Sequence, residues 1–91
     1  MPATLETLGP KASLYPEARV VLHDDDVHEM SEVVRYLTEA VPQLGRERCV
    51  AIMLEAHRLG MATVLEAPLE HAEGYAERLL LRGLQVTVEA A

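Results

Sequence analysis

The densest group of ionisable side chains is the run HDDDVHE at positions 23–29, which holds two histidines, three aspartates and a glutamate. Carboxylates and imidazoles are metal ligands, but the run lacks the D-x-D-x-D-G spacing of a calcium loop and the paired histidines of an H-E-x-x-H helix. We therefore expect no metal and no cofactor. The simpler interpretation is a polar turn, with Asp26 and His28 in the turn and at the cap of the helix that follows.

His57 is a second candidate, because it lies one position away from the apolar stripe of a predicted helix. Cys49 precedes it by about two helical turns, so a hydrolytic Cys–His pair is conceivable. However, Cys49 falls on the apolar stripe, where a buried free thiol is expected, and no third residue is placed to orient the histidine. We expect no catalytic residue and a protein that is not an enzyme.

The two candidates acquire a joint meaning if the strand that ends at His23 lies beside the helix that carries His57. Carboxylates and an imidazole would then converge at the rim of a pocket lined by Met and Val side chains. Such a pocket suits a small cation that carries an apolar side chain. A free peptide N-terminus is a cation of this kind.

The apolar periodicity predicts a β-α-α-β-α-β order of elements. A β-branched run and a strictly alternating last segment are typical of strands, while glycines and prolines mark the helix ends. Asp26 and Glu29 have the spacing of a capping box. We expect an α/β (α+β) two-layer sandwich, in which a small three-stranded sheet packs against three helices. The expected strands cover about 19–23, 61–65 and 84–89, and the expected helices about 30–41, 46–59 and 68–82.

Composition narrows the class of protein. The chain has 91 residues, enough for one domain, and no Trp or Phe, so its core must be aliphatic. Eight basic against fifteen acidic residues leave a net charge of −7, which argues against nucleic-acid binding. No apolar run is long enough to span a membrane, and we expect a cytoplasmic protein. Three of the five prolines fall in residues 1–17, which we interpret as a flexible arm before a domain over 18–91.

Two segments resemble the ClpS family, the bacterial adaptors of Clp proteases. VVLHDDDVHEM at 20–30 is similar to the family's apolar strand followed by N-D-D and, a few residues later, Pro-Met. IMLEAHRLG at 52–60 is similar to its M-L-x-V-H-x-x-G motif. The resemblance runs from about Arg19 to the end of the chain. It implies an adaptor that binds proteins with a free N-terminal Leu, Phe, Tyr or Trp and delivers them to the N-terminal domain of a ClpA- or ClpC-type unfoldase.

The resemblance also implies a binding site. Asp24, Asp25 and His57 fall where the family holds the α-amino group of the substrate. Met30 falls on the residue that screens out β-branched side chains. The pocket walls implied by the resemblance are Met30, Val33, Met53, Ala56 and Leu84.

The chain departs from the family motifs at four positions. Asp24 replaces Asn, so a group that donates and accepts becomes an acceptor only. His28 and Glu29 replace a small polar residue and Pro, and Ala56 replaces Val, which widens the expected pocket. The replacement of Asn and Pro in the first motif is the main support for one alternative, a ClpS-like paralogue that docks on the unfoldase and modulates it without binding N-terminal residues. A second alternative, an interaction domain like that of the ribosomal stalk, fits the negative charge poorly.

Overall fold

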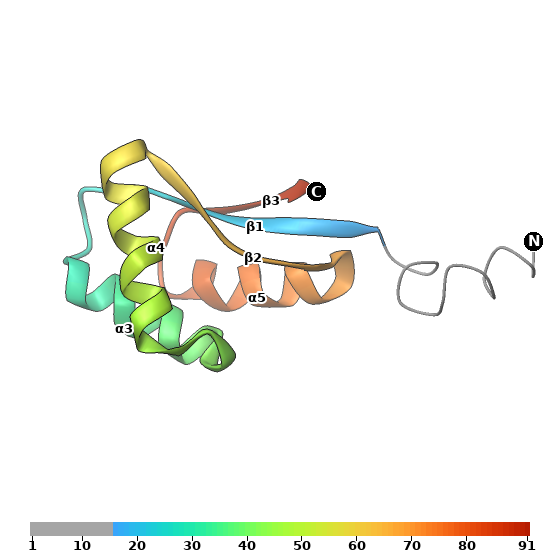
Figure 1. The fold of residues 1–91 in the computed structure, drawn as a ribbon, viewed down its shortest axis with the longest axis horizontal. Helices are drawn as coiled ribbons and strands as arrows, with labels where there is room; N and C mark the ends of the chain where they lie inside the picture. Colours follow the sequence, from blue (N-terminus) through green and yellow to red (C-terminus); the bar gives the residue numbers. More distant parts are fainter. Residues whose placement is uncertain (1–15) are drawn as a thin grey trace, which may run out of the picture.

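A computed structural model describes residues 16–91, so most of the predicted arm over 1–17 lies outside the described residues. The predicted order of elements is confirmed (Figure 1), with one short 3-10 helix, η1, added between the first two α-helices. The first strand begins two residues earlier than expected. In chain order, the elements are β1 (Glu17–His23), α3 (Met30–Ala40), η1 (Pro42–Leu44), α4 (Gly45–Leu59), β2 (Met61–Pro68), α5 (Leu69–Leu81) and β3 (Val86–Ala90).

The sheet is antiparallel, with β1 in the centre and β2 and β3 at its edges. Side chains alternate across β1, so Ala18, Val20 and Leu22 are buried in the core. Arg19, on the opposite face, pairs with Glu66 of β2 at 3.3 Å. One face of the sheet therefore carries the core and the other carries polar contacts, as the expected two-layer sandwich requires.

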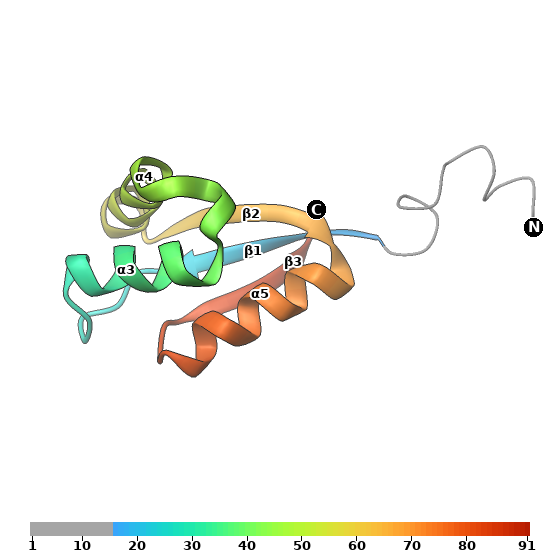
Figure 2. The same cartoon turned by 90° about the horizontal axis from the view of Figure 1, so that it is seen from below.

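The helices cover the core face of the sheet (Figure 2). α5 lies along the strands, whereas α3 and α4 gather at the end of the sheet where β1 finishes. The core between these layers is aliphatic, and Cys49 is a buried free thiol within it, as predicted. The largest fully buried side chains are Leu37, Ile52, Leu79, Val20, Val41, Val64 and Cys49.

Two local predictions about helix ends have different outcomes. Gly60 ends α4 in the left-handed conformation, with φ of 94°, as its position predicts. The capping pair of Asp26 and Glu29 is wrong, because Glu29 is itself the N-cap of α3. The Glu32 carboxylate accepts a hydrogen bond from the Glu29 N–H at 3.0 Å, so the acidic cap lies three residues later than expected.

The described part of the chain has neither a membrane-spanning helix nor a metal-binding cluster. None of the helices within residues 16–91 is long and apolar enough to cross a membrane. The same residues contain no cluster of three or more His, Cys, Asp or Glu side chains arranged to hold a metal ion.

Candidate functional site

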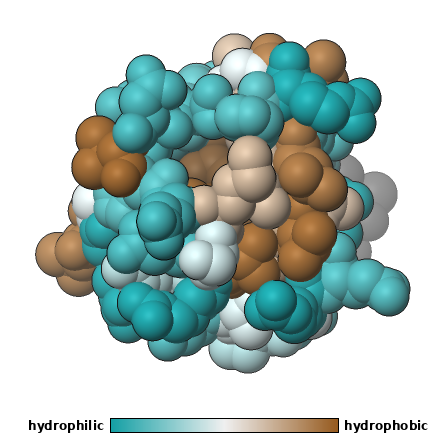
Figure 3. Space-filling view, turned by 90° about the vertical axis from the view of Figure 1, so that its left-hand side faces the viewer, coloured by the Kyte–Doolittle hydropathy of each residue, from teal (hydrophilic) through white to brown (hydrophobic). Residues whose placement is uncertain are grey.

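A cavity of about 430 Å³ opens at the end of the sheet where α3 and α4 meet the loop after β1. Its volume lies within the range of pockets that bind small ligands. Figure 3 views this end of the molecule and shows hydrophobic surface recessed among hydrophilic residues. The sequence placed its candidate residues on separate elements, and the fold brings most of them to this one cavity.

The inner wall of the cavity is apolar. Met30 and Val33 come from the first turn of α3, and Met53 and Ala56 come from α4. Both pairs are three residues apart, which places each pair on one face of its helix. These four predicted wall residues therefore face one space from two helices.

Leu84 is the exception among the predicted wall residues. It is 2% exposed and belongs to the core beside Leu79, and it does not line the cavity. The expectation that Leu84 forms part of the pocket is corrected, because this side chain is buried in the core cluster and is not among the residues that line the cavity.

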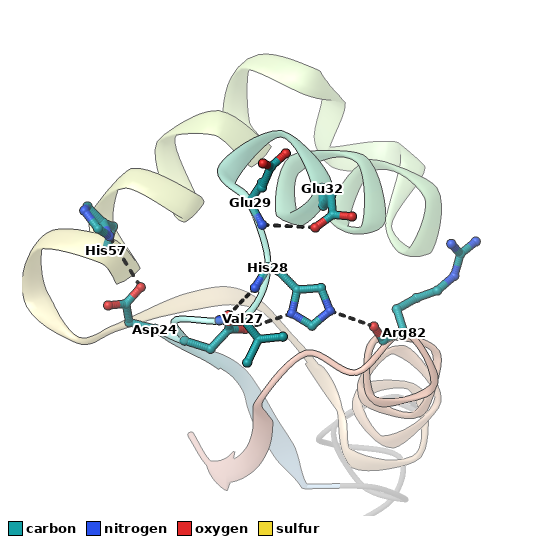
Figure 4. A network of polar contacts seen from close by, with 8 residues as sticks. Asp24, Val27, His28, Glu29, Glu32, His57 and Arg82 are labelled. Atoms are coloured by element: carbon teal, nitrogen blue, oxygen red, sulfur yellow. Dashed lines mark hydrogen bonds and ion pairs between the residues drawn. The ribbon is translucent and has the colours of Figure 1, made fainter.

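Asp24 and His57 face each other at the mouth of the cavity (Figure 4). The backbone N–H of Asp24 donates to the carbonyl of Gly60 at 3.0 Å, which anchors the loop beside the end of α4. Asp24 Oδ1 lies 3.5 Å from His57 Nδ1, and the two side chains are 36% and 55% exposed. Within residues 16–91, this is the only polar contact of the Asp24 carboxylate, so the pair retains hydrogen-bonding capacity toward solvent.

Asp25 has the opposite environment. Its Oδ1 accepts hydrogen bonds from the backbone N–H groups of Val27 and His28, both at 2.9 Å. Its Oδ2 lies 3.3 Å from His28 Nδ1, and its side chain is only 6% exposed. Burial alone would raise the pKa of Asp25, but the two backbone N–H groups and the imidazole outweigh it, so the pKa lies below its ordinary value.

The turn role that the sequence assigned to Asp26 therefore belongs to Asp25. Asp25 holds the loop by accepting two successive N–H groups, as aspartate commonly does in turns. Asp26 is exposed at the rim of the cavity. This division was not predicted, because three consecutive aspartates offer the same side-chain chemistry to the turn.

His28 lies in the turn, as predicted, but it also makes a contact that sequence reasoning missed. Its Nε2 lies 3.2 Å from the carbonyl oxygen of Arg82, at the end of α5 (Figure 4). The ring also meets Tyr36 of α3 edge to face, with centroids 5.9 Å apart. Since 54 positions separate His28 from Arg82, no local pattern could have revealed this contact.

Comparisons with known proteins agree with the resemblance of the two motifs. The family model described as ATP-dependent Clp protease adaptor protein ClpS matches residues 14–87. The ATP-dependent Clp protease adapter protein ClpS of Prochlorococcus marinus is 42% identical over 74 residues, which are 81% of this chain and 70% of the relative. That of Synechococcus elongatus is 40% identical over 79 residues, which are 87% and 83% of the two chains.

The fold is also shared with a solved structure, that of Agrobacterium tumefaciens ClpS2 bound to L-phenylalaninamide. The TM-score is 0.78 at 25% sequence identity, and the match covers 91% of this chain and all of the other. These matches favour a Clp adaptor over a domain of the ribosomal stalk. Two short motifs, the fold and the matches over most of its length agree that this chain belongs to the ClpS family of ATP-dependent Clp protease adaptors.

Proposed function

We propose that the cavity binds the N-terminal residue of substrate proteins, and that the chain delivers these substrates to a ClpA- or ClpC-type unfoldase. The observation that carries the proposal is the combination of an apolar cavity with an Asp–His pair at its mouth. An N-terminal Leu, Phe, Tyr or Trp has both matching parts, because its ammonium group and its large side chain are bonded to the same α-carbon.

The proposed amine site consists of Asp24 and His57. An ammonium group has three donors, and the carboxylate of Asp24 is an acceptor only. The ring of His57, whose Nδ1 lies 3.5 Å from Asp24, offers a further acceptor nitrogen when it is neutral. The exposed carboxylate of Asp26 adds negative potential at the rim. Charge-assisted hydrogen bonds of this kind are stronger than neutral ones.

Asp25 has a different part in this proposal from the one its sequence position implied. Both of its carboxylate oxygens already have partners inside the loop, so direct binding of the ligand would break existing hydrogen bonds. We assign Asp25 to holding the loop that presents Asp24. Asp25 then acts on ligand binding through the position of its neighbour.

The apolar wall is the proposed site of the ligand's side chain. Complete burial of a Leu or Phe side chain contributes about 1.5–3 kcal/mol. Met30 is exposed at the start of α3 and lines the cavity, and we assign to it the exclusion of β-branched side chains. The ligand of the related Agrobacterium protein, L-phenylalaninamide, has a free amine, an aromatic side chain and a carboxyl group blocked as in a peptide.

We also propose that the chain acts without catalysis. Among the residues that the structure describes, those that line the cavity include no Ser, Thr or Cys nucleophile, and Cys49 is buried elsewhere in the core. The relatives are named as adaptors of a protease, which assigns peptide-bond cleavage to the protease. Recognition of one residue is then the whole chemical task of the cavity.

A titration with fluorescent peptides tests the recognition step. Peptides that begin with Leu or Phe should bind, whereas the same peptides acetylated at the α-amino group, or begun with Val, should bind much more weakly. Acetylation removes the ammonium charge and leaves the acidic mouth unpaired. Equal binding of free and acetylated peptides would refute the proposed site.

Delivery requires a second experiment. A folded reporter with an N-terminal Leu should be degraded faster by a ClpA- or ClpC-containing protease when this chain is present, and a reporter with an N-terminal Val should not. If no peptide binds but the unfoldase's ATPase activity changes on addition of the chain, the paralogue that only modulates the unfoldase is the correct interpretation. The presence of Asp24 where the family motif has Asn is the reason for testing this alternative.

A further inference from the structure

We propose that His28 is a positioning residue whose charged form fastens the cavity loop to the turn between α5 and β3, so that ligand binding depends on its protonation. The inference rests on the proposed function for its effect on ligands. The fastening itself is a property of the free protein and is testable without any ligand.

Each ring nitrogen of His28 faces an oxygen atom of another residue. His28 Nδ1 lies 3.3 Å from a carboxylate oxygen of Asp25, and Nε2 lies 3.2 Å from the carbonyl oxygen of Arg82. Both partners are acceptors. A neutral imidazole has a single N–H, whereas the imidazolium has two. Only the charged ring therefore donates to both neighbours at once.

The ring is also held sterically between α3 and the end of α5. Tyr36 meets it edge to face at 83°, and the side chain of His28 is only 15% exposed. Gly83 packs against the other side, where an added Cβ would lie 3.4 Å from two ring atoms. Gly83 has φ of 85°, a conformation that other residues rarely adopt. The turn thus provides both the carbonyl and the space for the ring.

Charged groups around the ring come from three elements. The carboxylate of Asp25, in the loop, lies 3.3 Å from the ring. The guanidinium groups of Arg35 and Arg82 lie over Tyr36, 5.1 and 4.8 Å from its ring centre. Glu39 neutralises Arg82 at 2.7 Å. The carboxylate of Asp25 thus contacts the ring of His28 directly, while the two guanidinium groups contact Tyr36.

A change at His28 reaches the cavity through one short path. His28 donates its backbone N–H to Asp25 and faces the same carboxylate with its ring, so it contacts the group that shapes the loop twice. Asp24, the proposed amine ligand, is the preceding residue. A neutral His28 gives up one of its two ring hydrogen bonds, and the loop loses a constraint on the position of Asp24.

The expected pH dependence has a sign that separates His28 from His57. An imidazole changes charge between about pH 5 and 8. As pH rises, His28 loses a donor and ligand affinity should fall. Loss of the proton from His57 would have the opposite effect, because it restores an acceptor for the ammonium. The two histidines therefore oppose each other, and a variant at His28 isolates its share.

The binding experiment compares the wild type with His28→Asn and with His71→Asn, which removes an exposed histidine of α5 as a matched control. Affinity for a Phe-initiated peptide is measured between about pH 5.5 and 7.0, where the α-amino group stays largely charged. As the pH rises across this range, the affinity of the wild type should fall by about threefold to tenfold more than the affinity of His28→Asn. This is the change expected for the loss of one hydrogen bond. His71→Asn should follow the wild type.

The ring of the wild-type protein supplies an independent readout without a peptide. Nitrogen-15 NMR should show both ring nitrogens of His28 carrying protons at the acidic end of the range. As one ring proton is lost, the amides of residues 24–29 should lose protection relative to their intrinsic exchange rate at each pH, whereas the amides of the core strands should not. Parallel pH profiles for wild type and His28→Asn, or a ring that stays neutral throughout, would overturn the proposal. If no peptide binds at any pH, the proposed function fails while the NMR result still decides the fastening.

Discussion

Two aspartates that are adjacent in sequence each face a histidine, and the two pairs differ in almost everything else. The Asp24–His57 pair spans 3.5 Å at the cavity mouth, with side chains 36% and 55% exposed. The Asp25–His28 pair spans 3.3 Å inside the loop, with side chains 6% and 15% exposed. The side chains of the first pair can still hydrogen-bond a ligand, whereas those of the second pair already hydrogen-bond other groups of the protein.

The difference shows how a small domain separates recognition from stability within two residues. Exposed ion pairs contribute little to the free energy of unfolding, because water already solvates both partners. A buried carboxylate that accepts two backbone N–H groups is costly to remove, because the donors are left unpaired. Mutations of the exposed pair should therefore change binding, and mutations of the buried pair should change stability first.

The largest effect is expected for Asp24→Ala. The affinity for a peptide with a free N-terminal Phe should fall about 10- to 100-fold, the loss of one charged hydrogen bond. The melting temperature should stay within about 2 °C of wild type, because the lost contact is exposed. Calorimetric titration and thermal unfolding of the same sample measure both. An unchanged affinity would remove Asp24 from the site and erase the contrast between the pairs.

Asp25→Ala should mainly lower the free energy of unfolding, in contrast to Asp24→Ala, which should lower the affinity for the peptide. It removes the acceptor of two backbone N–H groups, so the free energy of unfolding should fall by about 1–3 kcal/mol, measured by urea denaturation. Asp25→Asn keeps an acceptor oxygen and should lose less. A variant that unfolds like the wild type would mean that the loop hydrogen bonds do not matter in solution.

Lowering the pH should weaken the buried Asp25–His28 pair, with a smaller loss in the free energy of unfolding than Asp25→Ala causes. The pKa of Asp25 lies below its ordinary value of 3.8, so its carboxylate stabilises the folded state above that pH. The contribution should disappear as the pH falls through the lowered pKa. Unfolding measured between about pH 5 and 2 should therefore show a component that Asp25→Asn removes. Asp24→Asn is the matched control, and a component lost equally in both variants would contradict the assignment.

The smallest effect is expected for Arg19→Ala. Arg19 and Glu66 form an ion pair at 3.3 Å on the polar face of the sheet, away from the cavity. The free energy of unfolding should change by no more than about 1 kcal/mol, and peptide affinity should not change. This variant shows whether exposure alone accounts for a small stability change. A loss of peptide binding would indicate that the site extends beyond the cavity.

The elements that position the site could be predicted because their signals are local. Helical spacing placed Met53 and Ala56 on one face, and Gly60 marked the end of α4 where the loop is anchored. The convergence of Asp24 with His57 followed once the strand end and this helix were taken as neighbours. These inferences needed only periodicity and one assumption about packing.

The remaining features depend on contacts between distant parts of the chain. The local pattern favoured Asp26, whereas the hydrogen bonds that hold the loop are accepted by Asp25, and the loop is also anchored by Asp24 to the distant Gly60. The contact of His28 with Arg82 requires the end of α5 to lie beside the loop. The burial of Leu84 in the core likewise depends on packing between elements that are separate in the sequence.

The most direct test of this account is the discrimination between a free and an acetylated N-terminal Phe peptide, measured as the ratio of their dissociation constants. The ratio should be large in the wild type, should collapse toward one in Asp24→Ala, and should persist in Asp25→Ala at a temperature where that variant is folded. A ratio that persists in Asp24→Ala and collapses in Asp25→Ala would contradict the central claim that the exposed pair binds the amine and the buried pair holds the loop.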